Sequence, residues 1–89
     1  MIAERQVTIL NTLGLHVRPS ALVAGKASEF RSTVAVLKDG QAVNAKSSID
    51  LLTLAAVVGT RLTIRAQGED AQAAVAAVAG LIEGKFGEE

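Results

Sequence analysis

The 89-residue chain has no cysteine and only one histidine, one proline and two aromatic residues. The absence of cysteine excludes disulfides, thiolate chemistry and cysteine-ligated metals. One histidine without cysteine does not make a convincing metal site, and we expect neither a metal nor a cofactor. Hydrophobic residues nevertheless make up 49% of the chain, so the core must be filled mainly by Val, Leu, Ile and Ala.

The chain also lacks an excess of charge of either sign, and it has no long apolar run. Nine basic residues balance nine acidic ones, which removes the broad positive field expected of a nucleic-acid-binding protein. No apolar run approaches the ~20 residues of a membrane-spanning helix, and the first six residues lack the basic-then-apolar order of a signal peptide. We therefore expect one cytoplasmic domain over residues 1–89, a monomer with no nucleic-acid partner and no membrane insertion.

The spacing of the apolar residues predicts seven elements. Strict alternation predicts strands, and helical spacing predicts helices. Asp39-Gly40 suits a type I′ hairpin turn because both central residues need a positive φ. Gly25 would weaken the first helix unless close packing compensates. The strands are expected at residues 5–10, 33–38, 41–45 and 61–67, the helices at 17–29, 49–57 (ended by Gly59) and 69–85, and a loose tail at 87–89.

The order of these elements is βαββαβα, which indicates an α+β fold. Each helix has one apolar stripe and the strands alternate, which favours a sheet with one covered face and one solvated face. The two-residue turn requires antiparallel pairing between the second and third strands. The expected architecture is an open-faced β-sandwich.

The only histidine and the only proline lie three residues apart, where the first helix begins. Proline is tolerated in a first helical turn because the N–H groups there have no intrahelical acceptor. With Pro19 in that turn, His16 lies at or beside the N-cap, and the backbone amides of Val17 and Arg18 are free. A helix N-terminus of this kind favours an anion.

These groups together suit a phosphoryl group. The imidazole of His16 supplies a nucleophilic nitrogen, and the guanidinium of Arg18 can pair with phosphate oxygens in a fork. From the residues alone an alternative stays open, in which His16 only caps the helix and Arg18 is a solvated surface charge.

Several segments resemble one known family. Residues 13–20 (Leu-Gly-Leu-His-Val-Arg-Pro-Ser), the Asp39-Gly40 turn, residues 44–47 (Asn-Ala-Lys-Ser) and Thr53-Leu54 are similar to the histidine-containing phosphocarrier protein HPr of the bacterial phosphoenolpyruvate-dependent sugar phosphotransferase system. The resemblance covers essentially the whole chain and keeps the spacing between the segments. It implies a four-stranded antiparallel sheet with three helices on one face.

The resemblance also implies a phosphoryl-group carrier rather than a stand-alone enzyme. His16 would accept the phosphoryl group on Nδ1 from enzyme I, which phosphoenolpyruvate charges, and pass it to the IIA domains of sugar permeases. Arg18 would support the phosphohistidine. The family usually has alanine where this chain has Val17 and Ser20; Val17 would narrow access to the ring, and the Ser20 hydroxyl would bind phosphate or face solvent.

Ser47 resembles the serine that HPr kinase/phosphorylase modifies in many members of the family, where the modification weakens exchange at the histidine. A phosphate there would gain the amides of a helix N-terminus and add about two negative charges. Two alternatives stay open: Ser47 is a plain N-cap, or the neighbouring Ser48 is modified instead.

An apolar docking surface is expected near His16. If the second helix buries Leu51, Leu54 and Ala55, its geometry turns two other apolar residues toward a different side, where they would join Leu22 in an exposed patch. The alternative is that these residues belong to the core. The docking residues expected are Leu22, Ser48, Ile49 and Leu52.

Two other functions stay open: a regulatory, nitrogen-related phosphorelay, and an allosteric binding protein whose histidine is incidental.

Overall fold

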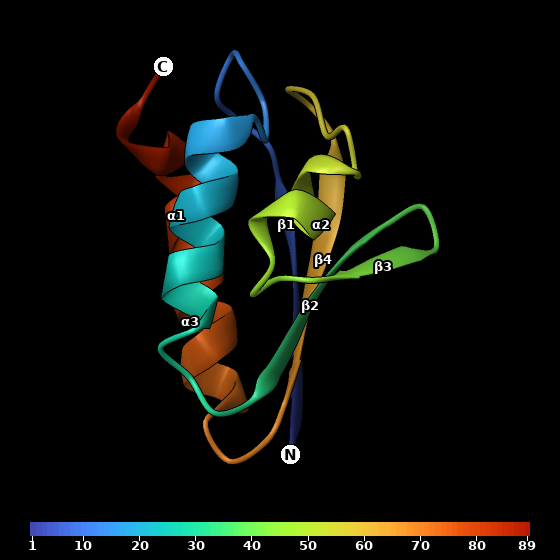
Figure 1. Ribbon diagram of the computed structural model, residues 1–89, viewed down its shortest axis with the longest axis vertical. Coiled ribbons are helices and arrows are strands. Elements are labelled where there is room, and N and C mark those ends of the chain that lie inside the picture. Colours follow the sequence, from blue (N-terminus) through green and yellow to red (C-terminus); the bar gives the residue numbers. More distant parts are fainter.

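The computed structural model describes residues 1–89. Its elements follow the predicted order, with a short 3₁₀ turn added near the C-terminus (Figure 1). No helix combines the length and the apolar character needed to cross a membrane. The strands are β1 (Ile2–Thr8), β2 (Thr33–Lys38), β3 (Gln41–Asn44) and β4 (Arg61–Gln67); the helices are α1 (Val17–Ala27), α2 (Ser48–Leu52), α3 (Ala71–Glu83) and η1 (Lys85–Gly87).

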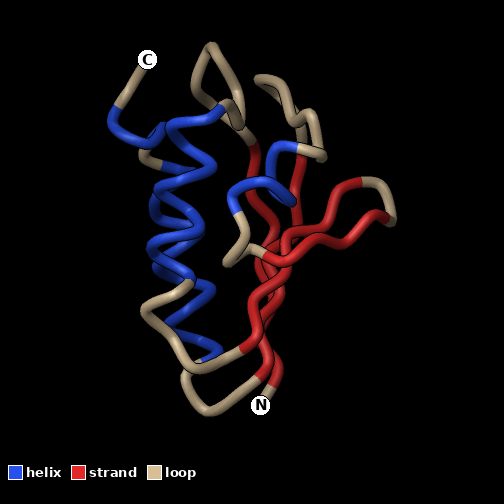
Figure 2. Tube along the Cα trace, in the orientation of Figure 1, coloured by secondary structure: helices blue, strands red, loops and turns tan.

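The four strands form one antiparallel sheet in the order β1-β4-β2-β3. In the register of the sheet, Val7 lies opposite Leu62 and Val36 lies opposite Ile64. All four side chains are buried because alternate residues of a strand point to the same face. Figure 2 shows the two long helices, α1 and α3, to one side of the strands. The predicted open-faced sandwich is confirmed.

One core of 21 buried hydrophobic residues fills the space between sheet and helices. It is aliphatic except for Phe86, which lies in η1 near the end of the chain. From α1 the buried apolar residues are Pro19, Val23 and Ala27. The residues that α3 buries are Ala71, Ala74, Val75, Val78, Ala79 and Ile82.

The turn between β2 and β3 is built as predicted. Asp39 has a φ of 48° and Gly40 a φ of 84°, which are the paired positive values of a type I′ turn. The Nζ of Lys38 donates to the carbonyl of Leu54 at 2.8 Å, so the end of β2 is tied to the chain that follows α2.

α2 is shorter than predicted, with five residues. Ala55 takes a φ of 49°, a left-handed value with which an α-helix does not continue. The chain reverses here and brings the carbonyl of Ala56 to the amide of Leu15, at 2.9 Å. Ala55 is therefore exposed rather than buried, and Gly59 lies in a loop instead of ending the helix.

The carboxylate of Asp70 ties the start of α3 to the start of β2. It accepts hydrogen bonds from the amides of Arg31 and Ser32, both at 2.9 Å, and from the Ser32 hydroxyl. These contacts lower the pKa of Asp70 from an ordinary 3.8 to about 2, and the Ser32 hydroxyl is the largest cause.

Asp70→Ala is expected to lower the midpoint of thermal unfolding at neutral pH by several degrees, because three donors lose their acceptor. The folded-state pKa lies below the unfolded-state value, so the contribution of Asp70 is complete above about pH 4 and is lost as the pH falls toward about 2. Melting curves followed by circular dichroism should therefore converge for the two proteins over this range. Glu69→Ala, at the exposed neighbour, is the control; a constant gap between wild type and Asp70→Ala would contradict the assignment.

Candidate functional site

His16 is the N-cap of α1, as the position of Pro19 predicts. Its backbone is extended (φ −81°, ψ −167°), and its carbonyl accepts the first helical hydrogen bond from the amide of Ser20 at 3.0 Å. The amides of Val17 and Arg18 donate to no other backbone group. Two free donors and the positive end of the helix therefore lie next to the imidazole.

Gly14 sets the path of the chain into His16. It has a φ of +70°, and a Cβ at this position would lie 2.5 Å from the carbonyl oxygen of Ala56. That carbonyl accepts a hydrogen bond from the amide of Leu15, and the Nδ2 of Asn11 donates to the carbonyl of Gly14 at 2.8 Å. The histidine is thus fixed by this loop on one side and by α1 on the other.

Glu88 lies against His16, which the sequence did not predict. Its Oε1 lies 2.8 Å from Asn11 Nδ2 and 2.9 Å from His16 Nε2, and its Oε2 accepts from Arg18 Nη1 at 2.8 Å. These contacts lower the pKa of Glu88, with the hydrogen bond to His16 the largest cause. The prediction of a loose tail over residues 87–89 is therefore wrong.

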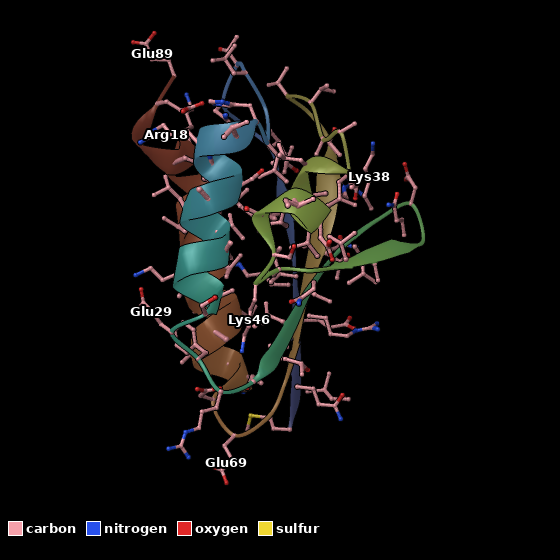
Figure 3. All side chains as sticks on the ribbon, in the orientation of Figure 1. Arg18, Glu29, Lys38, Lys46, Glu69 and Glu89 are labelled. Carbon is pink, nitrogen blue, oxygen red and sulfur yellow. The ribbon has the colours of Figure 1, made fainter.

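Two further contacts hold the C-terminal segment in place. Arg18 Nη1 also donates to the carbonyl of Phe86 at 3.0 Å, and the amide of Thr12 donates to the carbonyl of Glu89 at 2.8 Å. Figure 3 shows Arg18 and Glu89 at the same end of the molecule. Phe86, buried to 3% exposure, was the one sign in the sequence that this segment packs, because a large aromatic residue is rarely left in a free tail.

The two positions that depart from the family pattern differ in their surroundings. Ser20 is completely buried, and its hydroxyl donates to the carbonyl of Leu15 at 3.3 Å. It faces neither a phosphate nor solvent, so that expectation is wrong. Val17, the residue after His16, is 69% exposed, so its branched side chain faces solvent.

Ser47 is the N-cap of α2, and its Oγ accepts a hydrogen bond from the amide of Asp50 at 3.2 Å. The predicted cap is confirmed, whereas modification of Ser47 stays a prediction. Leu22, Ile49 and Leu52 are 38%, 75% and 39% exposed. They are therefore outside the core, on two helices that pack against each other. Ser48, the first residue of α2, is half-buried.

More apolar surface lies on two loops at the His16 end of the molecule. The loops are joined by hydrogen bonds from Ile9 N to Thr60 O and from Gly59 N to Ile9 O, and Figure 1 shows them beside the start of α1. The sequence-based prediction missed this surface because it extended the second helix to residue 57. The exposed loop residues are Leu10, Leu13, Val57 and Val58.

No group of three or more His, Cys, Asp and Glu side chains could hold a metal ion.

Fold and site together define a class of small α+β protein, in which an open-faced sandwich presents a histidine at the N-terminus of its first helix. Residues 3–84 match the family model described as the PTS HPr component phosphorylation site. The phosphocarrier protein HPr of Cupriavidus necator is 41% identical over 85 residues, which is 96% of each chain. The phosphocarrier protein NPr of Shewanella violacea is 40% identical over 96% of this chain and 93% of its own.

The solved structures agree with the sequences. The crystal structure of HPr-C-His from Thermoanaerobacter tengcongensis is similar with a TM-score of 0.93 and 42% identity, and it covers 98% of both chains. The chain therefore belongs to the HPr family of phosphocarrier proteins.

Proposed function

We propose that His16 carries the phosphoryl group, accepting it from enzyme I and passing it to the IIA domains of sugar permeases. The observation that carries this proposal is the position of His16 as N-cap of α1 beside the free amides of Val17 and Arg18. Those amides and the helix dipole favour a negatively charged group next to the ring. In this role the chain is a transiently phosphorylated carrier in the cytoplasm, a monomer, and not a stand-alone enzyme.

Arg18 is the second group that we propose to act on phosphate. Its side chain is 54% exposed, so the guanidinium has room to turn from Glu88 toward a phosphoryl group on His16. A planar guanidinium pairs with two phosphate oxygens and remains charged at every relevant pH. Arg18 therefore stabilises the negative charge on the phosphoryl oxygens without taking part in proton transfer.

A two-step relay tests the proposed function. Enzyme I, phosphoenolpyruvate and an isolated IIA domain are combined with and without the protein. The IIA domain should become phosphorylated only when the protein is present, and His16→Ala should remove the effect. Equal phosphorylation of the IIA domain with the His16→Ala variant would contradict the proposal.

A regulatory phosphorelay is the second candidate function. Its support is that the NPr relative is 40% identical to this chain and the HPr relative 41%, which does not separate the two. The discriminating measurement compares onward transfer from the phosphorylated protein to a sugar-type and to a nitrogen-type IIA domain. Faster transfer to the nitrogen-type domain would replace the sugar-transport proposal by the regulatory one.

We propose that Ser47 is the residue modified by an HPr kinase/phosphorylase. Incubation with that kinase and ATP is expected to label one site by mass spectrometry, and Ser47→Ala should remove the label. The substitution also removes the cap of α2, so it should lower the free energy of unfolding by about 0.5–2 kcal/mol. Ser48→Ala is the matched control. A label that survives Ser47→Ala and disappears in Ser48→Ala would move the site by one residue.

Leu22, Ser48, Ile49 and Leu52 form the proposed docking patch. Ile49→Glu is expected to raise the KM for transfer from enzyme I about tenfold, because a charge would be buried at an apolar interface. The free energy of unfolding should change by less than about 0.5 kcal/mol, since the side chain is exposed. Ile2→Glu is the control: Ile2 is 62% exposed and begins β1, and Figure 1 shows the N-terminus at the other end of the molecule from the start of α1. Equal effects of the two substitutions would contradict the patch.

A further inference from the structure

The carboxylate of Glu88 is bound on both of its oxygens, although Glu88 is the penultimate residue of the chain. Three side chains from the loop before α1 and from its first turn converge on its carboxylate: Asn11, His16 and Arg18. The side chain of Glu88 is only 20% exposed. Such a carboxylate has a fixed direction toward the histidine ring, unlike a solvated acid in a free tail.

The contact fixes which nitrogen of the His16 ring carries the proton. The pKa of Glu88 is below its ordinary value, so the group is an anion at neutral pH and can only accept a hydrogen bond. Nε2, at 2.9 Å from Oε1, must therefore be the donor. In the neutral imidazole the lone pair is then on Nδ1, which makes no hydrogen bond within the protein.

We propose that Glu88 is a positioning residue that occupies Nε2 of His16 and reserves Nδ1 as the nucleophile. The inference rests on the proposed function for the identity of the reaction. It goes beyond that function, because it assigns the choice of nitrogen to a residue of the C-terminal segment. Asn11 supports the arrangement by donating to the same Oε1 atom and to the carbonyl of Gly14.

The chemical step balances without any further group. The Nδ1 lone pair forms the new N–P bond, while the bond from phosphorus to the donor's leaving group breaks and that group keeps the bonding electrons. The proton stays on Nε2, so the ring becomes a cation. Glu88, already hydrogen-bonded to Nε2, offsets this charge. Transfer to an acceptor reverses each change.

Inorganic phosphoramidate is a suitable probe because it phosphorylates histidine without a protein partner and releases ammonia. The position of the label is read by ¹H–³¹P correlation: a phosphoryl group on Nδ1 couples only to Hε1, and one on Nε2 couples to both Hε1 and Hδ2. In the wild type we expect Nδ1 product in excess by about tenfold or more, as a hydrogen bond to a charged group allows. Glu88→Ala should give substantial Nε2 product.

Two variants separate positioning from a merely structural role. Glu88→Gln keeps an oxygen that can accept from Nε2 but loses the charge, so it should restore selectivity for Nδ1 at a rate about tenfold lower. Glu89→Ala keeps the backbone carbonyl that Thr12 binds and should behave as the wild type. Amide NMR spectra of each variant verify that the fold is intact.

The proposal is overturned by an unchanged preference for Nδ1 in Glu88→Ala, by labelling of the wild type on Nε2, or by no labelling of the wild type. Failure of the proposed function looks different. In that case phosphoramidate would still label Nδ1 in a Glu88-dependent way, while enzyme I and phosphoenolpyruvate would leave the protein unlabelled.

Discussion

Arg18→Ala is expected to slow the phosphorylation of His16 by enzyme I about 10²-fold. The guanidinium is the one cationic side chain in contact with the His16–Glu88 pair, and removal of a single preorganised donor to a charged transition state has effects of about 10²–10³. Most of the loss should appear in kcat, because the group acts on charge that develops during transfer. Rapid-quench kinetics with phosphorylated enzyme I measure it.

Two further substitutions define what Arg18 contributes. Arg18→Lys keeps a positive charge without the planar fork, and we expect a loss of about tenfold. Arg31→Ala removes the same charge in the loop between α1 and β2, where only the backbone amide of Arg31 is hydrogen-bonded, and should leave the rate unchanged. A rate for Arg18→Ala that equals the rate for Arg31→Ala would show that Arg18 acts only through the net charge of the protein.

Gly14→Ala is expected to be the most destabilising single substitution near the site, by about 2–5 kcal/mol. Two causes combine. The φ of +70° is unfavourable for alanine, and the new Cβ would lie 2.5 Å from Ala56 O and 3.0 Å from Val57 Cα, which are backbone atoms that cannot turn away. Urea unfolding followed by circular dichroism measures the change, and the amide signals of Leu15 and His16 should shift.

Gly25→Ala is the matched control within α1. A Cβ at Gly25 meets nothing within 4 Å, so the close packing that the sequence suggested as compensation for this glycine is absent. Alanine there should stabilise the protein by about 0.5–1 kcal/mol. The same substitution should thus act in opposite directions at two positions 11 residues apart. An unchanged stability in Gly14→Ala would contradict the geometry of the Gly14 loop, and destabilisation by Gly25→Ala would contradict the open space beside Gly25.

The sequence predicts the local geometry of the fold and of the site well. Asp39-Gly40 determines a turn type because both residues need left-handed backbone, and Pro19 locates the first turn of α1 because its missing N–H is tolerated there. His16 then falls at the N-cap. These predictions succeed because each depends on interactions within a few residues.

Features that depend on distant segments could not be predicted in the same way. The chain that follows α2 is held by the hydrogen bond from the amide of Leu15 to the carbonyl of Ala56, which lie 41 positions apart in the sequence. The contact of Glu88 with His16 spans 72 positions, and an acidic residue near a chain end gives no periodic signal. Only the presence of Phe86 hints at it, because a large aromatic residue is rarely left in a free tail and its neighbours then lie close to the core.

The most direct test of the central claim is phosphorus NMR of the protein after incubation with enzyme I and phosphoenolpyruvate. We predict one phosphoramidate signal, coupled only to Hε1 of His16, and no signal from His16→Ala under the same conditions. A phosphoramidate signal of equal intensity in His16→Ala, or no signal from the wild type while enzyme I itself is phosphorylated, would contradict the assignment of His16 as the phosphoryl carrier.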